Sequence, residues 1–210
     1  EGVEFDKVLD AGRAYLIPGL VDIHTHGRAS HDFCSAGSEE LHVMAKSYLN
    51  SGVTTVMPTL ATAPFDELLS AADRIRAAKD TGGARFIGIH LEGRFINPGK
   101  RGAQSGELIS PPDICELEML TKRAGLPFHI TFAPELDPGG EFLSRALELG
   151  GTAAAGHTMM TYAEARAAEQ RGITAYSHLF NSMPPMHHRA GGVVCAALTG
   201  SAFCELICDG

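Results

Sequence analysis

Short apolar stretches alternate with stretches of helical periodicity along almost the whole chain. The apolar stretches have strand composition and cover Tyr15–Ile23, Val53–Leu60, Phe86–Leu91, Pro127–Ala133, Thr152–Ala155, Ile173–Tyr176 and Phe203–Cys208. Helical spacing of apolar residues marks Glu39–Asn50, Pro64–Lys79, Pro111–Ala124, Gly140–Leu149, Tyr162–Arg171 and Val193–Leu198. This alternation predicts βαβ units and a parallel sheet of seven strands.

Polar residues at the carboxyl ends of these strands decide between an open sheet and a barrel. They are His24, His26, His90, Glu92, His157 and His178. In a barrel, strand ends ring a single mouth where active sites are built, whereas an open sheet would string them along an edge. No G-x-G-x-x-G motif follows the first strand, which argues against a dinucleotide fold. The chain is therefore predicted to form a (β/α)₈ TIM-type barrel.

The domain prediction has two parts. Residues 1–17 are too short to fold alone and are interpreted as the remnant of a small β domain. Residues 18–210 are interpreted as a partial barrel that stops after its seventh strand, because (β/α)₈ barrels run to about 250 residues.

The spacing of the strand-end residues indicates a divalent metal. Residues i and i+2 of a strand face the same side, so His24 and His26 project together. Two imidazoles with the oxygen ligand Glu92 and the later His157 and His178 suit Zn²⁺ or Fe²⁺. An H-x-H pair alone is equally explained by one packed and one surface histidine. His90 is expected to support a ligand or pack, and the surface or core is expected for His31, His42 and His129.

Composition and charge exclude several function classes. The hydrophobic fraction of 44% and charged fraction of 20% are those of a globular protein. A net charge of −8 without Lys/Arg blocks gives no support for nucleic-acid binding. No apolar run is long enough for a membrane span, and no signal peptide is visible. Five scattered cysteines without a C-x-x-C motif fit reduced thiols in a cytoplasmic protein.

Five motifs together carry a resemblance to a known family: PGLVDIHTHG at Pro18–Gly27, GIHLEGRFIN at Gly88–Asn97, GHT at Gly156–Thr158, SHLFNSM at Ser177–Met183, and HHR at His187–Arg189. The chain resembles the N-acetylglucosamine-6-phosphate deacetylases of the amidohydrolase superfamily. The resemblance implies a metal-dependent barrel hydrolase, a homodimer, that removes acetate from the 2-acetamido group of an amino-sugar 6-phosphate.

The resemblance also implies roles for single residues. Glu92, His157 and His178 match metal ligands, and His24 and His26 match the pair that holds a further ion in many members. One or two ions are expected, with zinc preferred over iron. The residues matched to the sugar-phosphate substrate are Asn181, Ser182 and Arg189, the last reaching across the dimer interface, and Gln104. His187 and His188 are expected to lie near substrate or in solvent.

Three departures from the family pattern carry information. Arg94 stands where the family has proline, and it could compete with the metal for Glu92 or turn out to solvent. Gln104 replaces a loop histidine, which bears on substrate orientation. The family's general-base aspartate ends the eighth strand and is expected beyond Gly210, since Asp209 matches the end of the seventh.

Without that base no catalytic residue is predicted in these 210 residues, and this chain alone should be nearly inert. Two alternatives stay open. The first is another amidohydrolase, such as a cyclic amidase or dipeptidase. The second is a metal- and sugar-phosphate-binding fragment without turnover.

Overall fold

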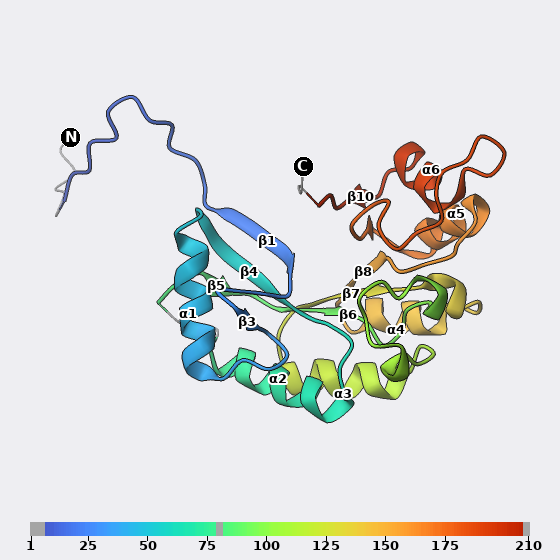
Figure 1. Ribbon diagram of the computed structural model, residues 1–210, viewed down its shortest axis with the longest axis horizontal. Coiled ribbons are helices and arrows are strands. Elements are labelled where there is room, and N and C mark those ends of the chain that lie inside the picture. The colour runs from blue at the N-terminus through green and yellow to red at the C-terminus, as the bar shows by residue number, and fades with distance from the viewer. Residues whose placement is uncertain (1–6, 79–81, 208–210) are drawn as a thin grey trace.

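The computed structural model describes residues 7–78 and 82–207. A single curled sheet forms its centre (Figure 1). Its strands follow one another in parallel in the order β1 (Leu20–Thr25), β4 (Val53–Leu60), β6 (Ile89–Glu92), β7 (Phe128–Phe132), β8 (Thr152–Ala155), β9 (Ala175–Tyr176) and β10 (Phe203–Cys204). β5 (Arg85–Phe86) also pairs with β4. The parallel sheet of a partial barrel is confirmed, with β1 and β10 as its edges.

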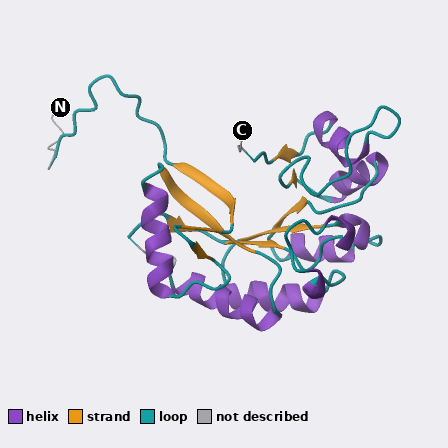
Figure 2. Cartoon of the chain, viewed as in Figure 1, coloured by secondary structure: helices purple, strands orange, loops and turns teal. Residues whose placement is uncertain are grey.

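Helices cover the outer side of the sheet (Figure 2). They are α1 (Ser38–Leu49), α2 (Phe65–Ala77), α3 (Ile114–Ala124), α4 (Glu141–Glu148), α5 (Tyr162–Arg171) and α6 (Gly192–Thr199). The 3₁₀ turns η1 (Pro98–Lys100), η2 (Gly106–Leu108) and η3 (Pro134–Leu136) lie in the loops that follow β6 and β7. In α1, Leu41, Met44 and Tyr48 are fully or almost fully buried. Their spacing of three and four residues puts them on one helix face. The core therefore lies between sheet and helices.

Helix starts follow from capping. α3 begins at Ile114 rather than at the predicted Pro111, because the Asp113 side chain accepts a hydrogen bond from the Glu116 backbone N–H at 3.0 Å. α5 begins with a capping box in which Thr161 and Glu164 satisfy each other's backbone N–H groups. These caps fix where each helix starts and so the length of the loop before it.

The predicted strand Phe86–Leu91 is two short strands, β5 and β6. β5 pairs with the first half of β4 and β6 with its end. At Gly88, between them, a Cβ would lie 2.4 Å from the Pro127 carbonyl oxygen, so only glycine allows this approach. The last strand ends at Cys204 and not at Cys208, which lies outside the described residues.

A small hairpin after β1 was not predicted. β2 (Gly27–Arg28) pairs antiparallel with β3 (His31–Asp32). Ala29 and Ser30 make the turn with φ of 55° and 63°. Such turns are usually signalled by asparagine or glycine, and the sequence has neither here.

The N-terminal stretch does not test the domain prediction. Residues 7–17 contain no strand and extend away from the sheet (Figure 1), and residues 1–6 lie outside the described part. Within the described ranges, no helix combines the length and apolarity needed to cross a membrane.

Candidate metal centre

The Glu92 carboxylate is the centre of the site. Glu92 ends β6 and is buried, with four histidine side chains around it. Its Oε1 lies 3.0 Å from His178 Nε2, 3.1 Å from His24 Nε2 and 3.2 Å from His157 Nε2. Its Oε2 lies 2.9 Å from His26 Nε2. The curled sheet thus brings all five residues predicted as metal ligands to one point.

The imidazoles of His157 and His178 are fixed by backbone carbonyl groups. His157 Nδ1 donates to the Lys100 oxygen at 2.8 Å, and His178 Nδ1 donates to the Asn181 oxygen at 3.1 Å. A carbonyl oxygen only accepts, so Nδ1 of each ring carries a proton, and Nε2 is the ring nitrogen that faces Glu92. The two Nε2 atoms are 3.1 Å apart. Histidines that bind metals are held in this way.

The backbone at both histidines is unusual. φ is 48° at His157 and 34° at His178, in the left-handed region that residues other than glycine rarely adopt. Each such residue costs about 1–3 kcal/mol and persists only where its surroundings hold it. The left-handed turns direct the side chains of His157 and His178, which follow β8 and β9, back toward Glu92.

His24 lies in the edge strand β1 and His26 directly follows it, and both are held differently. His24 Nδ1 lies 2.7 Å from Oε2 of Glu205, a residue just beyond β10. Burial lowers the pKa of His24, but hydrogen bonds to Glu205 and Glu92 outweigh it and raise the pKa to about 9. The His26 side chain is 43% exposed, and within residues 7–78 and 82–207 its Nδ1 has no hydrogen-bond partner.

The charge on Glu92 follows from these neighbours. Burial raises its pKa, but hydrogen bonds from the surrounding histidines, led by His157, reverse the shift and hold the pKa well below its usual range. The carboxylate therefore stays ionised and available as a hard oxygen ligand.

This donor set fits a divalent metal. Two groups of three ligand atoms lie within 4.8 Å of one another, namely Glu92 with His157 and His178, and Glu92 with His24 and His26. Both groups combine imidazole nitrogen with carboxylate oxygen, the set found in catalytic zinc and non-haem iron sites. Because Glu92 belongs to both groups, the site could hold one ion or two.

A cavity of about 490 Å³ opens over the carboxylate. Beside the five ligand candidates, it is lined by Gln104, Asn181, Ser182 and Glu205. Gln104 Nε2 donates to Glu92 Oε2 at 2.9 Å, and its Oε1 accepts from the Thr62 N–H at 2.8 Å. Gln104 therefore also holds Glu92, a contact that the sequence did not reveal.

Comparisons with known proteins agree with this geometry. The sequence profile of the Amidohydrolase family matches residues 15–199. The chain belongs to the amidohydrolase family. An N-acetylglucosamine-6-phosphate deacetylase of Bacillus subtilis is 35% identical over 202 residues, covering 93% of this chain and 51% of that protein. An N-acetylgalactosamine-6-phosphate deacetylase of Escherichia coli O157:H7 is 32% identical, covering 97% of this chain and 55% of that protein.

Solved amidohydrolase structures share the fold. N-acetyl-D-glucosamine-6-phosphate deacetylase of Mycobacterium smegmatis superposes with a TM-score of 0.86 at 32% identity, covering 92% of this chain and 51% of that one. A mutant of that enzyme was solved in complex with N-acetyl-D-glucosamine-6-phosphate, and its TM-score is 0.84 at 31% identity, covering 90% of this chain and 50% of that one. The chain spans about half the length of the curated relatives it matches.

The position of Arg94 in this amidohydrolase chain contradicts both alternatives predicted for it. It neither reaches Glu92 nor turns out to solvent. Its guanidinium forms two hydrogen bonds of 2.9 Å with Glu116 on α3 and stacks 5.9 Å from the Phe65 ring. The reason is the backbone, since φ of 63° at Arg94 directs the side chain toward the outer helices.

Two further buried histidines of the amidohydrolase chain, His90 and His129, are not among the metal-ligand candidates. His90 is buried and bonds the Thr59 hydroxyl at 3.1 Å and the Thr131 hydroxyl at 2.8 Å, which agrees with a supporting or packing role. His129 is also buried, and its Nδ1 lies 2.7 Å from the Thr152 hydroxyl.

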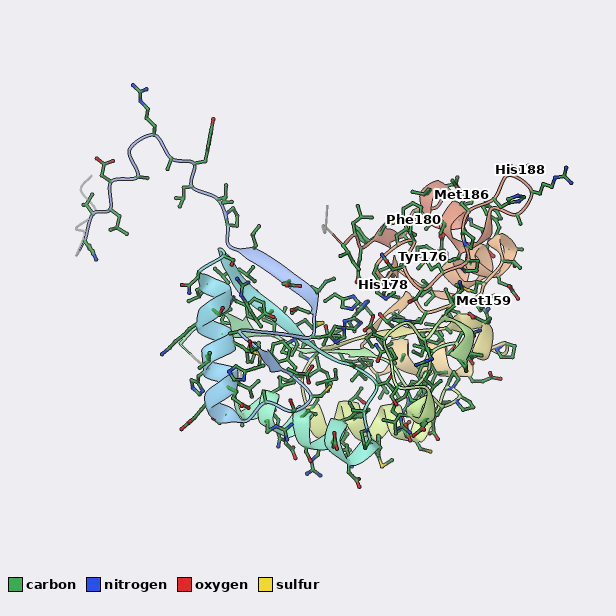
Figure 3. The ribbon with its side chains drawn as sticks, viewed as in Figure 1. Met159, Tyr176, His178, Phe180, Met186 and His188 are labelled. Carbon is green, nitrogen blue, oxygen red and sulfur yellow. The ribbon has the colours of Figure 1, made fainter. Side chains whose placement is uncertain are left out.

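The loop that carries Arg189 lies apart from the cavity. His187, His188 and Arg189 are exposed, and Arg189 Nε donates to His188 Nε2 at 3.1 Å. Figure 3 shows His188 at the outer tip of this loop, far from His178. Within this chain, Arg189 is therefore not part of the cavity that contains the ligands.

Glu205 is the main residue of the site that the sequence reasoning missed. The predicted strand Phe203–Cys208 placed it inside a strand and not at its end. Because the strand stops at Cys204, Glu205 occupies the same strand-end position as the metal-ligand candidates. A correct end for that strand would have revealed it.

Proposed function

We propose that this protein is a metal-dependent deacetylase that hydrolyses the N-acetyl group of N-acetylglucosamine 6-phosphate, giving glucosamine 6-phosphate and acetate. The observation that carries the proposal is the ligand set around Glu92, with Asn181 and Ser182 in the same cavity. The two relatives described above are both named as deacetylases of amino-sugar phosphates, which supports the proposal. These 210 residues alone are proposed to be nearly inactive, because the general base is proposed to lie beyond them.

The metal is proposed to be Zn²⁺ in preference to Fe²⁺. Glu92, His157 and His178 would hold one ion, and His24 and His26 would hold a second with Glu92. A bound ion of this kind polarises a carbonyl oxygen and lowers the pKa of water to about 7. The chain's own part is to keep Glu92 ionised and the imidazole lone pairs directed inward, which the backbone hydrogen bonds of His157 and His178 support.

Substrate binding is proposed for three further residues that line the cavity. Asn181 and Ser182 follow the His178 strand end, so a sugar phosphate bound there presents its 2-acetamido group to the ligand set. Gln104 lines the same cavity next to Glu92 and is proposed to orient the acetamido group.

Proton transfer is proposed to need a group that the described residues do not supply. Beside Glu92, the carboxylate that lines the cavity in the described part is Glu205, whose Oε2 is held by His24. Asp209 lies outside the described residues. We place the general base on an aspartate beyond Gly210, and such a base contributes typically ~10²–10⁴-fold in rate.

A homodimer in the cytoplasm is the proposed setting. Arg189 is exposed on a loop bounded by Pro184-Pro185 and Gly191-Gly192, where its planar fork can reach the phosphate in a neighbouring subunit. The four described cysteines are unpaired, as expected for reduced thiols. Residues 1–17 are proposed to belong to a small β domain.

The test is an assay of the intact protein for acetate and free amine. We expect turnover of N-acetylglucosamine 6-phosphate, loss of turnover on chelation, and recovery with Zn²⁺. Unphosphorylated N-acetylglucosamine should react far more slowly. Turnover of a dipeptide or cyclic amide alone would contradict the proposal and favour another amidohydrolase. Binding of metal and sugar phosphate without acetate release would favour the non-catalytic alternative.

N-acetylgalactosamine 6-phosphate is a second candidate substrate. The relative from Escherichia coli O157:H7, 32% identical over 97% of this chain, is named for it. The two sugars differ only in configuration at one hydroxyl group. Comparing kcat/KM for both in the same assay decides between them.

The phosphate assignment has its own test. In the intact protein, Arg189→Ala should raise KM for the phosphorylated sugar and leave the unphosphorylated analogue nearly unchanged. Equal losses on both substrates would mean that Arg189 has a structural role only.

A further inference from the structure

Glu135 joins three loops at the mouth of the sheet. It lies in η3, directly after β7. Its Oε1 accepts hydrogen bonds from Asn97 Nδ2 at 3.0 Å and from the Met159 N–H at 2.6 Å, and its Oε2 accepts from the Thr158 hydroxyl at 2.5 Å. Asn97 follows β6, while Thr158 and Met159 follow β8. In the described part of the chain, no Lys or Arg forms an ion pair with Glu135. Its carboxylate is therefore bound by these neutral donors.

These hydrogen bonds surround the turn that holds His157. The His157 carbonyl oxygen accepts from the Asn97 N–H at 2.9 Å, and Glu135 in turn holds the Asn97 side chain. The two residues after His157 are bound to Glu135 directly. A closed ring of contacts therefore runs from Glu135 through Asn97 to His157 and back through the 158–159 backbone.

The ring matters because His157 is in a strained conformation. Its φ of 48° is stable only where surrounding contacts impose it. Hydrogen bonds to a carboxylate are roughly twice as strong as those between neutral groups. Glu135 itself does not line the cavity. Its contacts act on the turn and not on a bound molecule.

We propose that Glu135 is a positioning residue that holds the 157–159 turn, with His157 in its left-handed conformation, and so keeps His157 Nε2 directed at the metal site. The inference rests on the proposed metal site. It adds a residue that the sequence motifs did not single out.

The experiment is a titration of the metal-free intact protein with Co²⁺, followed by its visible absorption, and with Zn²⁺ by calorimetry. Glu135→Ala should weaken binding at the tighter site by about 10–100-fold, the loss typical when a partner that orients a metal ligand is removed. It should also change the Co²⁺ spectrum. Glu135→Gln should recover much of the affinity, because its amide can accept from Met159 and donate to the Thr158 hydroxyl.

Asp137 provides a matched control in the same loop. It is buried, and its carboxylate accepts from the backbone N–H groups of Phe142 at 3.3 Å and Leu143 at 3.0 Å at the start of α4. Asp137→Ala should lower the melting temperature of the metal-free protein and leave the metal Kd unchanged. A general effect of destabilisation would appear equally in both variants.

Unchanged Kd in Glu135→Ala, or an equal loss in Asp137→Ala, would overturn the inference. If Glu135→Ala does not fold, Thr158→Val serves instead, because it keeps the shape and removes the hydroxyl that donates to Glu135 and accepts from the Met160 N–H at 3.1 Å. It should weaken binding by about 2- to 10-fold, and an unchanged Kd there would equally overturn the inference. If the wild-type protein binds no metal, the proposed function fails first.

Discussion

The two pairs of histidines around Glu92 are held by different means. His157 and His178 follow the interior strands β8 and β9, are nearly buried, and donate from Nδ1 to backbone carbonyl groups. His24 lies in the edge strand β1, and His26 directly follows that strand. His24 depends on the side chain of Glu205, and His26 Nδ1 finds no hydrogen-bond partner among the described residues.

The difference predicts unequal metal sites. A ligand fixed by backbone contacts loses little freedom on binding, whereas an exposed one on an edge strand must still be ordered. The pKa of about 9 at His24 adds a proton that an ion must displace at neutral pH. We therefore expect the Glu92–His157–His178 group to bind the tighter ion and the Glu92–His24–His26 group the weaker one.

The largest loss of metal affinity is expected from Glu92→Gln, which removes the carboxylate that both ligand groups share. Affinity should fall more than ~100-fold at both sites, beyond the loss caused by removing an orienting partner. Metal analysis after dialysis measures it. Glu118→Gln, on the outer helix α3 and paired with Arg145, is the control and should keep full metal content. One ion retained in Glu92→Gln would show that the groups are independent.

His178→Ala and His26→Ala separate the two groups. His178→Ala, and equally His157→Ala, should abolish the tighter ion, since each supplies one of its three ligands. His26→Ala should remove only the weaker ion and leave the tighter Kd unchanged. Calorimetric titration distinguishes the two classes. Undiminished metal in both His157→Ala and His178→Ala would refute the assignment of the tighter site.

A smaller loss of metal affinity, confined to the weaker ion, is expected from Glu205→Gln. The change removes the charge that orients His24 Nδ1 at 2.7 Å. The weaker ion should lose about 10-fold in affinity. The tighter ion should be unaffected, because the amide oxygen of glutamine can still accept the His178 N–H, which lies 3.3 Å away. Equal losses of affinity at both metal sites would mean that Glu205 stabilises both ligand groups and not His24 alone.

The smallest effect concerns the anchoring of β1. The Tyr48 hydroxyl lies 2.6 Å from the Thr25 hydroxyl, between His24 and His26 in sequence. Tyr48→Phe should lower the free energy of unfolding by about 1 kcal/mol, the net value of one hydrogen bond. Denaturant unfolding measures it. Tyr162→Phe, whose hydroxyl is exposed at 3.4 Å from Thr199, should change nothing measurable.

Most strands and helices could be predicted from the sequence, whereas the β2–β3 hairpin could not. The strand Val53–Leu60 and the strand Thr152–Ala155 have the bounds predicted for them, because alternation and β-branched content are local properties. Histidines and Glu92 at strand ends were readable too, since a parallel barrel has only one mouth. The predicted strand that includes Gly88 was divided in two, and its backbone there approaches the Pro127 carbonyl oxygen closely.

The contacts inside the site were decided only by the tertiary structure. Glu205 meets His24 across 181 positions of sequence, and Arg94 pairs with Glu116 on a helix that no motif links to it. A pattern in sequence fixes which face a side chain occupies, but the curl of the sheet and the left-handed backbone at His157 and His178 fix which atoms meet. Hydrogen bonds act over about 3 Å. Only the folded chain sets distances that finely.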